Sequence, residues 1–390
     1  MVSLKVSSFL GSARSYASAY KYTILVAIAA ILFLDVLIQV ATSGPKPSRE
    51  IAKAHSKEQI ASVKKNVNDP MAIELRLLRA YPYGDTDPEK NIWQLWETER
   101  HSNTFIEEAK PLVTKWSEEN EGYGHLCLSI EEAEVKVEQI KDTVPEVWEA
   151  YKALPHRRHK YEFLKYLLVY LYGGTYADID VEPQIPIKDW YRPRMMFGRV
   201  FVGILGDVNE EDWNKWLNRR LTFSTSVFQS RSKHPFLAKL ISRISYIALH
   251  ERKKFAKIDW EKAFQDTDAT GEPTISFTGP SIFSDTLIDY FNSIPNAAVH
   301  VVSKSFKSPI DHSDAFVGPP VPESQQFSYK TFSQALAPSQ VENVVIYPQI
   351  SFQGPLVNDE KYARYQKLFF ARPHGFLPKW GYKANLGLAK

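Results

Sequence analysis

Apolar and polar residues follow two different spacings along the chain from Asn91 onward. Segments with apolar residues three or four positions apart predict amphipathic helices, whereas short apolar runs bounded by turn residues predict strands. Because the two kinds of segment alternate, the pattern indicates an α/β domain over residues 91–390. The predicted helices span residues 103–120, 130–143, 159–172, 234–253 and 280–294, and the predicted strands span residues 91–96, 175–181, 195–205, 297–303 and 343–349.

The N-terminal part of the chain carries a different pattern. Residues 22–41 are almost entirely apolar, and their number matches the roughly 20 residues with which a helix crosses a bilayer. The charged residues before this run are all basic, so we expect residues 1–21 to be a cytoplasmic tail and the rest of the chain to be lumenal, as in a type II membrane protein. Small residues after position 41 leave a cleaved signal peptide as the alternative.

Residues 42–90 are rich in Lys, Ser and Pro, and their charges alternate in sign along two helix-compatible pieces. This pattern is typical of a solvated helix, and it predicts a stem between the membrane and the main domain. Dense turn-forming residues at positions 82–90 mark the predicted end of the stem.

The predicted helix 159–172 is followed by two glycines, where a helix cap with positive φ is expected, and then by YADIDV. In a strand, residues two apart point to the same face, so we expect Asp178 and Asp180 to project together while Ile179 faces the core. Two neighbouring carboxylates raise each other's pKa unless a cation relieves the repulsion. Their oxygens suit Mn²⁺ or Mg²⁺, and α/β sheets bind ligands at the carboxyl ends of strands. The pair therefore predicts a metal site that neutralises an anion such as a sugar-nucleotide diphosphate.

The composition argues against some classes of protein but does not identify the function. The 48 Lys+Arg residues nearly balance the 45 Asp+Glu residues, which argues against a nucleic-acid binder with its concentrated basic surface. The single cysteine, Cys127, excludes an intrachain disulfide. The 9 Trp, 20 Tyr and 22 Phe fit either a sugar-handling protein or an ordinary aromatic core. No second carboxylate pair has suitable flanks, so a hydrolase is disfavoured.

A D-x-D pair alone is a weak signal, because short motifs also occur by chance on solvated loops. Longer matches accompany it here. The block KYEFLKYLLVYLYGGTYADIDV resembles the signature of the family 32 glycosyltransferases, and NIWQLWE resembles the opening strand of their fungal initiation-specific α-1,6-mannosyltransferases. Three further blocks are similar to that group in the same order, and the resemblance covers residues 91–380: DWNKWLNRRLTFSTSVFQSRSKHPFLAKLISRI, FTGPSIFSDTLIDYF and VVIYPQISFQ.

The resemblance implies a GT-A fold, which is a nucleotide-sugar-binding α/β sandwich. It also implies GDP-mannose as the donor, Mn²⁺ as the metal and retention of the anomeric configuration. By position, Asp180 is expected to coordinate the metal directly, and Asp178 to contact the ribose or reach the metal through water. Trp93 in the opening strand is expected near the nucleotide base, with a core tryptophan as the equally weighted alternative. The anchor and stem suit a Golgi resident.

Other positions match the family's pattern less closely. Glu162 and Lys165 stand where the family has Asp and Arg, so the resemblance implies donor binding, with a salt-bridged pair one turn apart as the alternative. His374 lies in an altered C-terminal block and is a candidate third ligand to the metal or the diphosphate. Arg219 and Arg220 match an R-R pair that would meet donor phosphate or acceptor hydroxyls.

Three candidates lie on the predicted acceptor side. Gly279 and Pro280 are expected to form a turn that shapes the acceptor pocket. Asp285, one helical turn further on, is a candidate acceptor contact or a helix-start charge. Residues 308–314, SPIDHSD, carry metal-binding residue types, but their Pro and Ser content favours a solvated loop.

The resemblance as a whole predicts a Golgi α-1,6-mannosyltransferase that extends protein-linked N-glycans or cell-wall mannan. Two alternatives stay open. One is mannose transfer onto inositol-phosphoceramide, although such enzymes tend to carry extra membrane helices and none is evident after residue 41. The other is a weakly active scaffold in a hetero-oligomeric complex with other mannosyltransferases, which the departures at Glu162, Lys165 and the C-terminal block keep open.

Overall fold

The parts of the chain described by the computed structural model are residues 70–190, 198–208, 210–295, 297–302, 315–320, 327–354 and 368–375. The predicted tail and anchor, residues 42–69 of the predicted stem, and the segment 308–314 lie outside the described residues. Within the described part, no helix combines the length and apolar character needed to cross a bilayer. All elements below belong to the compact unit Ile51–Lys390.

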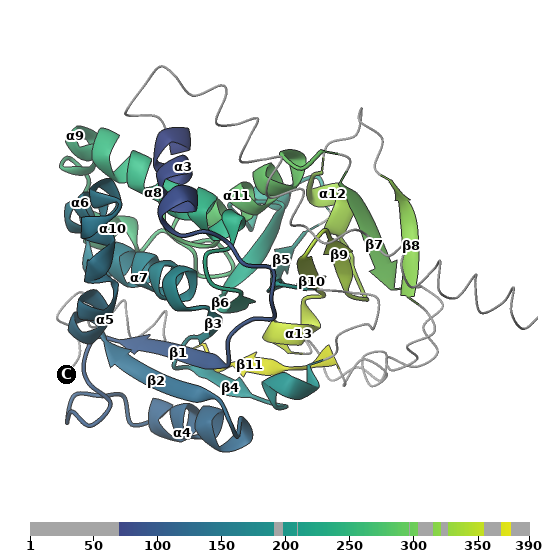
Figure 1. Cartoon of the computed structure of the whole chain (residues 1–390), viewed down its shortest axis with the longest axis horizontal. Coiled ribbons are helices and arrows are strands. Elements are labelled where there is room, and N and C mark those ends of the chain that lie inside the picture. The colour runs from purple at the N-terminus through teal and green to yellow at the C-terminus, as the bar shows by residue number, and fades with distance from the viewer. Residues whose placement is uncertain are drawn as a thin grey trace, which may run out of the picture. The chain divides into compact units, whose positions relative to one another are not determined.

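The centre of the domain is a mixed β-sheet, which in the described residues has nine strands in the order β2-β1-β3-β6-β5-β10-β9-β7-β8 (Figure 1). β1 is parallel to β2 and β3, β10 is parallel to β5, and the other pairs are antiparallel. A two-stranded ribbon pairs β4 with β11. The strands are β1 Asn91–Trp96, β2 Gly124–Ser129, β3 Gly174–Ala177, β4 Val181–Pro183, β5 Val200–Asp207, β6 Leu221–Ser230, β7 Ala298–Val302, β8 Ala315–Pro320, β9 Ser339–Val341, β10 Val344–Tyr347 and β11 Ala371–Pro373.

Central strands of the sheet are buried on both faces because apolar residues occupy successive positions along them. In β5, Val200 and Val202 belong to one core cluster and Phe201 to a second, and in β10 Ile346 and Tyr347 divide in the same way. Successive side chains of a strand point to opposite faces, so a continuous apolar run fills two cores at once. Such runs require cover on both sides of the sheet.

Helices supply this cover. α7 and α8 contribute to the core that contains Val200, whereas Trp116 of α4 and Phe352 of α13 contribute to the core on the other face. α4 also contacts β4 and β2, at the opposite side of the sheet from α7 in Figure 1. The helices are α3 Pro70–Ala80, α4 Ala109–Glu119, α5 Ile130–Val137, α6 Pro145–Ala153, α7 Arg157–Tyr172, α8 Pro235–His250, α9 Arg252–Phe255, α10 Trp260–Ala263, α11 Pro280–Asn292, α12 Tyr329–Phe332 and α13 Ile350–Gln353, with 3₁₀ turns at Glu138–Asp142, Ile187–Asp189 and Trp213–Lys215.

The predicted α/β class is confirmed, and each predicted helix between residues 91 and 390 has a counterpart in the structure. The helix predicted over residues 130–143 is divided, since α5 ends at Val137 and a 3₁₀ turn follows. The strands β2, β6, β8, β9 and β11 were not predicted. β6 carries Thr222 and Ser224, which read as polar in the sequence but are fully buried in the sheet.

The helix α3 lies in the segment assigned to the solvated stem, and its packing corrects that assignment. Leu77 is fully buried, its carbonyl accepts a hydrogen bond from the Tyr170 hydroxyl at 3.1 Å, and α3 contacts α8. Further along, the Arg199 guanidinium pairs with Asp85 at 2.9 Å and with Asp87 at 3.0 Å. The packed domain therefore begins before residue 91, because α3 has an apolar face that this domain buries.

Candidate active site

Two glycines position the turn that carries the aspartates. Gly173 and Gly174 have φ values of 66° and 106°, in a region that glycine enters without steric cost. A Cβ atom on Gly174 would collide with the main chain of Asn91, and one on Gly173 would collide with the Glu89 side chain and lie 2.8 Å from the Ser232 nitrogen. A side chain in place of either glycine would therefore obstruct the passage of the chain from α7 to β3.

The D-x-D residues lie in a turn after β3, which corrects the expectation of one continuous strand over residues 175–181. At the end of β3 the Asp178 N–H donates to the Ser226 carbonyl at 2.8 Å. The Val181 N–H then donates to the Asp178 carbonyl at 3.1 Å, which closes the turn before β4 begins. Ile179 is buried, as expected. The two carboxylates are brought together by a turn and not by the alternation of a strand.

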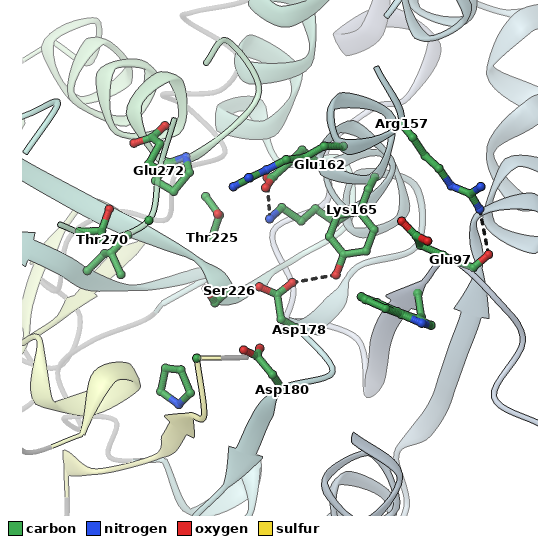
Figure 2. A pocket seen from close by; sticks show the side chains of 18 of the residues that line it. Glu97, Arg157, Glu162, Lys165, Asp178, Asp180, Thr225, Ser226, Thr270 and Glu272 are labelled. Carbon is green, nitrogen blue, oxygen red and sulfur yellow. Dashed lines mark hydrogen bonds and ion pairs between the residues drawn. The ribbon is translucent and has the colours of Figure 1, made fainter. Parts of the chain in front are cut away.

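The turn opens into a cavity of about 260 Å³ (Figure 2). In Figure 2, the carboxylates of Asp178 and Asp180 point into the same space, below the Glu162 and Lys165 side chains of α7. Five carboxyl groups and three cationic side chains belong to the lining. The lining residues are Trp96, Glu97, Ile130, Arg157, Arg158, Tyr161, Glu162, Lys165, Asp178, Asp180, Leu205, Thr225, Ser226, Thr270, Gly271, Glu272, Pro280, Gln353, Pro373 and Gly375.

One oxygen of Asp178 is held by two tyrosines. Oδ1 accepts hydrogen bonds from the Tyr176 hydroxyl at 2.7 Å and from the Tyr161 hydroxyl at 3.0 Å. Burial raises the pKa of the Asp178 carboxyl, the Lys165 ammonium opposes this rise, and Glu162 adds to it. Within the described residues, Oδ2 accepts no hydrogen bond and is available to a ligand. The tyrosines thus fix the orientation of the Asp178 carboxyl group. An additional cation beside it would favour its ionised form.

Glu162 and Lys165 line the same cavity and form an ion pair of 2.8 Å. The Lys165 side chain is only 1% exposed, and its ammonium lies 5.4 Å from the centre of the Tyr176 ring. The alternative of a salt-bridged pair one turn apart is therefore confirmed as geometry, but Lys165 is buried and Glu162 is partly buried, beside Asp178 in the cavity.

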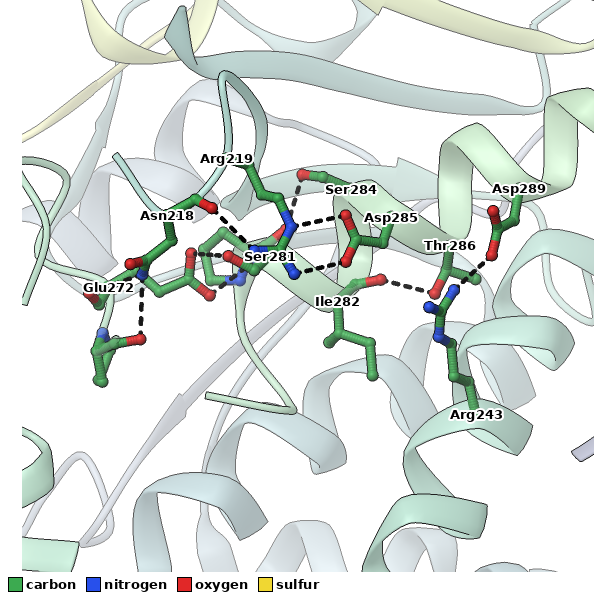
Figure 3. A network of polar contacts seen from close by, with 12 residues as sticks. Asn218, Arg219, Arg243, Glu272, Ser281, Ile282, Ser284, Asp285, Thr286 and Asp289 are labelled. Carbon is green, nitrogen blue, oxygen red and sulfur yellow. Dashed lines mark hydrogen bonds and ion pairs between the residues drawn. The ribbon is translucent and has the colours of Figure 1, made fainter. Parts of the chain in front are cut away.

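A further carboxyl group, Glu272, lines the cavity beside the start of α11. Its Oε1 accepts a hydrogen bond from the Ser281 N–H at 2.8 Å and its Oε2 accepts one from the Ser281 hydroxyl at 2.7 Å (Figure 3). Burial raises the pKa of Glu272 to about 7, although both hydrogen bonds oppose the shift. Glu272 is therefore a titratable group of the cavity with a pKa near neutrality.

Trp93 does not line the cavity. Its indole N–H donates to the Gly173 carbonyl at 2.8 Å and its ring is 4% exposed within the main core, which favours the core alternative. Trp96, from the same strand, lines the cavity instead. Arg219 also lies outside the cavity lining. Its guanidinium makes two hydrogen bonds of 2.8 Å with Asp285 (Figure 3).

The remaining predicted residues divide between the cavity and its surroundings. Pro280 lines the cavity at the first position of α11, and Gly279 precedes it as the N-cap residue. The space at Gly279 is limited, since a Cβ atom there would lie 3.0 Å from a Glu272 carboxylate oxygen. The guanidinium of Arg220 lies 4.5 Å from the centre of the Tyr329 ring and is not part of the lining.

His374 reaches the aspartate turn through its main chain. Its N–H donates to the Asp180 carbonyl at 2.9 Å, while its Nε2 lies 3.1 Å from a carboxylate oxygen of Glu182. The neighbours Pro373 and Gly375 line the cavity, but the imidazole does not. The C-terminal block thus lies next to the turn, but the His374 side chain, the candidate third ligand, pairs with Glu182 and does not line the cavity.

The two aspartates fit a divalent cation whose shell is completed by a ligand. In the part of the chain that the structure describes, no three His, Cys, Asp or Glu side chains gather to hold a metal by themselves. Asp178 and Asp180 nevertheless supply hard oxygen donors in one cavity. Phosphate and water oxygens commonly complete the coordination of such ions beside one or two carboxylates.

Several lining residues escaped the sequence analysis. Arg158 lies four positions before Glu162 and seven before Lys165, so helical spacing places the three side chains along one side of α7. That spacing could have revealed Arg158. Glu97 and Glu272 come from segments distant in sequence, and no local pattern connects them with the aspartates.

Comparison with known proteins agrees with this geometry. Residues 107–196 match the family described as glycosyltransferase sugar-binding region containing DXD motif. The matched region contains α7, the two glycines and the aspartate turn. The predicted resemblance is thereby confirmed, and the site defines the class of the protein: it is a glycosyltransferase.

Relatives from Candida albicans, Schizosaccharomyces pombe and Saccharomyces cerevisiae carry the same name. The chain is 28% identical over 303 residues to the initiation-specific alpha-1,6-mannosyltransferase of Candida albicans, over 76% of this chain and 73% of that protein. It is 30% identical over 206 residues to the initiation-specific alpha-1,6-mannosyltransferase of Schizosaccharomyces pombe, over 51% of this chain and 48% of that protein. Among solved structures, the PaToxG glycosyltransferase aligns with a TM-score of 0.32 at 14% identity, over 61% of this chain and 79% of that chain, which is too distant to support a conclusion.

Proposed function

We propose that this glycosyltransferase moves mannose from GDP-mannose to a mannose-containing glycan, an N-glycan outer chain or cell-wall mannan, and forms an α-1,6 linkage. The observation that carries the proposal is the pair Asp178 and Asp180 in a cavity beside Glu162 and Lys165. The names of these relatives support mannose and the linkage. The motif resemblance supports Mn²⁺, a GT-A fold, retention of the anomeric configuration and a location in the Golgi. The apolar run 22–41 supports a single-pass type II membrane protein.

The charges of the cavity support binding of the donor together with a divalent cation. Carboxyl groups outnumber cationic side chains in the lining, so a diphosphate alone would meet walls of its own sign. Asp178 and Asp180 would hold the cation, which when bound neutralises the diphosphate and stabilises it as a leaving group. An intact aspartate pair favours an enzyme over a scaffold.

The protein's own residues prepare this arrangement. Tyr161 and Tyr176 hold Oδ1 of Asp178 and leave its other oxygen for a ligand. The Lys165 ammonium counters the rise in the pKa of Asp178 and so favours its ionised form. The Asp178 carboxylate is thus already oriented before the cation and the sugar nucleotide bind, which reduces the entropic cost of binding.

Hydroxyl and carboxyl groups offer contacts for the acceptor. Thr225, Ser226 and Thr270 line the cavity, and Glu272 lies beside Pro280 at the same wall. A glycan presents many hydroxyl groups, so side chains that both donate and accept hydrogen bonds suit it. We assign these residues to acceptor binding.

Manganese-dependent transfer tests the proposal. The purified full-length chain, in detergent, is incubated with GDP-mannose and a high-mannose N-glycan, with Mn²⁺ or with EDTA. We expect mannose transfer with Mn²⁺ and none with EDTA, and a product that a linkage-specific α-1,6-mannosidase reverses. Asp180→Ala is expected to lower the rate about 100-fold or more, because it removes an oxygen ligand from the proposed site.

The matched control is Asp289→Ala. Asp289 is an acidic residue whose carboxylate pairs with Arg243 on the protein surface, and it does not line the cavity. This variant is expected to keep the wild-type rate. A folded wild-type protein that binds neither GDP nor Mn²⁺ would refute the proposed metal-dependent transfer from GDP-mannose and favour the scaffold alternative.

A further inference from the structure

Among the described residues, one cation of the cavity has no hydrogen-bond or ion-pair partner for its charged group. In the described residues, the Arg158 guanidinium makes no hydrogen bond to a side chain or carbonyl and no ion pair, although it lines the cavity. The other two lining cations are engaged. Arg157 donates to the Glu97 carbonyl at 2.9 Å and Lys165 pairs with Glu162 at 2.8 Å.

The position of Arg158 is fixed despite the lack of a partner. Its N–H donates to Nδ1 of His156, the N-cap residue of α7, at 3.0 Å. Its guanidinium carbon lies 5.2 Å from the centre of the Phe264 ring, and that ring is itself buried. Cation–π contact of this kind restricts an arginine side chain while leaving its N–H groups unused.

The surroundings make an unpartnered guanidinium costly. Burial lowers the pKa of Arg158, while the charges of Glu162, Glu272 and Asp178 oppose this effect from the cavity walls. Arg158 also lies in the first turn of α7, where the helix dipole disfavours a cation and where no acidic residue compensates. A bound anion that uses the guanidinium N–H groups would remove both costs.

We propose that Arg158 is a donor-binding residue that contacts the diphosphate of the nucleotide sugar. This proposal rests on the proposed function, since it assumes that a nucleoside diphosphate enters the cavity. It assigns to Arg158 the planar, two-pronged recognition of phosphate oxygens that Lys165 cannot provide, because an ammonium is a point charge. Arg158, Glu162 and Lys165 then act as one row of side chains on α7.

The alternative role for Arg158 is structural, as a counter-charge to the neighbouring carboxyl groups. The two roles make different predictions for binding. A structural arginine affects the unfolding temperature but leaves the diphosphate affinity of the folded protein unchanged. A diphosphate contact affects the affinity for GDP and for inorganic pyrophosphate, but not that for guanosine, which has no phosphate.

Calorimetric titration with these three probes separates the roles. The full-length protein, in detergent and with Mn²⁺ present, is titrated with GDP, guanosine and inorganic pyrophosphate, for the wild type, Arg158→Gln and Arg158→Lys. We expect Arg158→Gln to weaken GDP and pyrophosphate binding by about 10- to 100-fold, the loss typical of a charge-assisted hydrogen bond. Arg158→Lys keeps the charge but not the planar guanidinium, so we expect it to bind more tightly than Arg158→Gln and more weakly than the wild type.

The matched control is Arg243→Gln, which removes the same charge from an arginine that pairs with Asp289 and does not line the cavity. Its affinity for all three probes is expected to equal that of the wild type. Wild-type binding of GDP that Arg158→Gln leaves unchanged, in a variant with a normal unfolding transition, would overturn the assignment of Arg158. Lack of GDP binding by the wild type would instead count against the proposed function.

Discussion

Glu272 shows how a single carboxyl group connects helix packing with the cavity. It lies at the wall of the cavity and receives two hydrogen bonds from Ser281 in the first turn of α11. A carboxylate at a helix N-terminus satisfies N–H groups that have no partner in the helix. Burial nevertheless dominates and raises the pKa of Glu272 to about 7. The group therefore titrates where most enzymes work.

Its titration makes stability depend on pH. Between the ordinary pKa of 4.5 and the raised value of about 7, the folded state holds a proton that the unfolded state has released. The free energy of unfolding therefore falls as pH rises through this interval, by at most about 3 kcal/mol, and is level above it. We expect Glu272→Gln to flatten this slope, as measured by urea unfolding between about pH 5 and 7.5. Equal slopes in the two proteins would contradict the raised pKa.

At this scale the sequence predicts residues that share a local pattern. Asp178, Asp180, Glu162 and Lys165 lie in one block of 19 residues, and the structure brings all four to the cavity. Tertiary packing brings Glu272 to the same cavity, and no periodic pattern in the sequence reveals such packing. Trp93 was ambiguous because an indole ring fits a core as well as a nucleotide site.

The connection between α7 and β3 depends on glycine at the scale of elements. We expect Gly174→Ala to lower the free energy of unfolding by about 2 kcal/mol or more, because it adds both an unfavourable φ of 106° and a collision with the main chain of Asn91. Denaturant unfolding followed by tryptophan fluorescence measures this loss.

Gly122→Ala is the control for that substitution. Gly122 has a φ of 82°, but no atom lies within 4 Å of the Cβ that alanine would add. It isolates the cost of the backbone conformation, which we expect to be about 1 kcal/mol. Equal losses in the two variants would show that the close approach to Asn91 has no energetic weight.

Element prediction failed where polarity and burial disagree. Thr222 and Ser224 of β6 are fully buried although both are polar, and Thr222 lies opposite Gly206 of β5 in the sheet. The aspartate turn was read as a strand because Ile179 alternates with two acids, a pattern that a buried turn produces equally well. Periodicity identified the long helices better, since α7 and α8 each repeat their apolar pattern over 16 residues.

The whole domain includes a helix that the sequence placed outside it. We expect Leu77→Ala to lower the free energy of unfolding by about 2 to 5 kcal/mol, because it leaves a cavity beneath α3. Met71→Ala is the control on the same helix, since Met71 is 37% exposed, and we expect a change within about 0.5 kcal/mol. Denaturant unfolding of the two variants measures both values. A small loss for Leu77→Ala would restore α3 to the solvated stem.

The short ribbon of β4 and β11 determines when the cavity is completed during synthesis. Pro373 and Gly375 form part of the cavity wall, and the His374 N–H is bonded to the Asp180 carbonyl. Glu182 and its partner His374 lie 192 positions apart. A ribosome must therefore translate through β11 before the aspartates acquire this wall. A nascent chain that stalls before β11 carries the aspartate motif but lacks this part of the cavity wall.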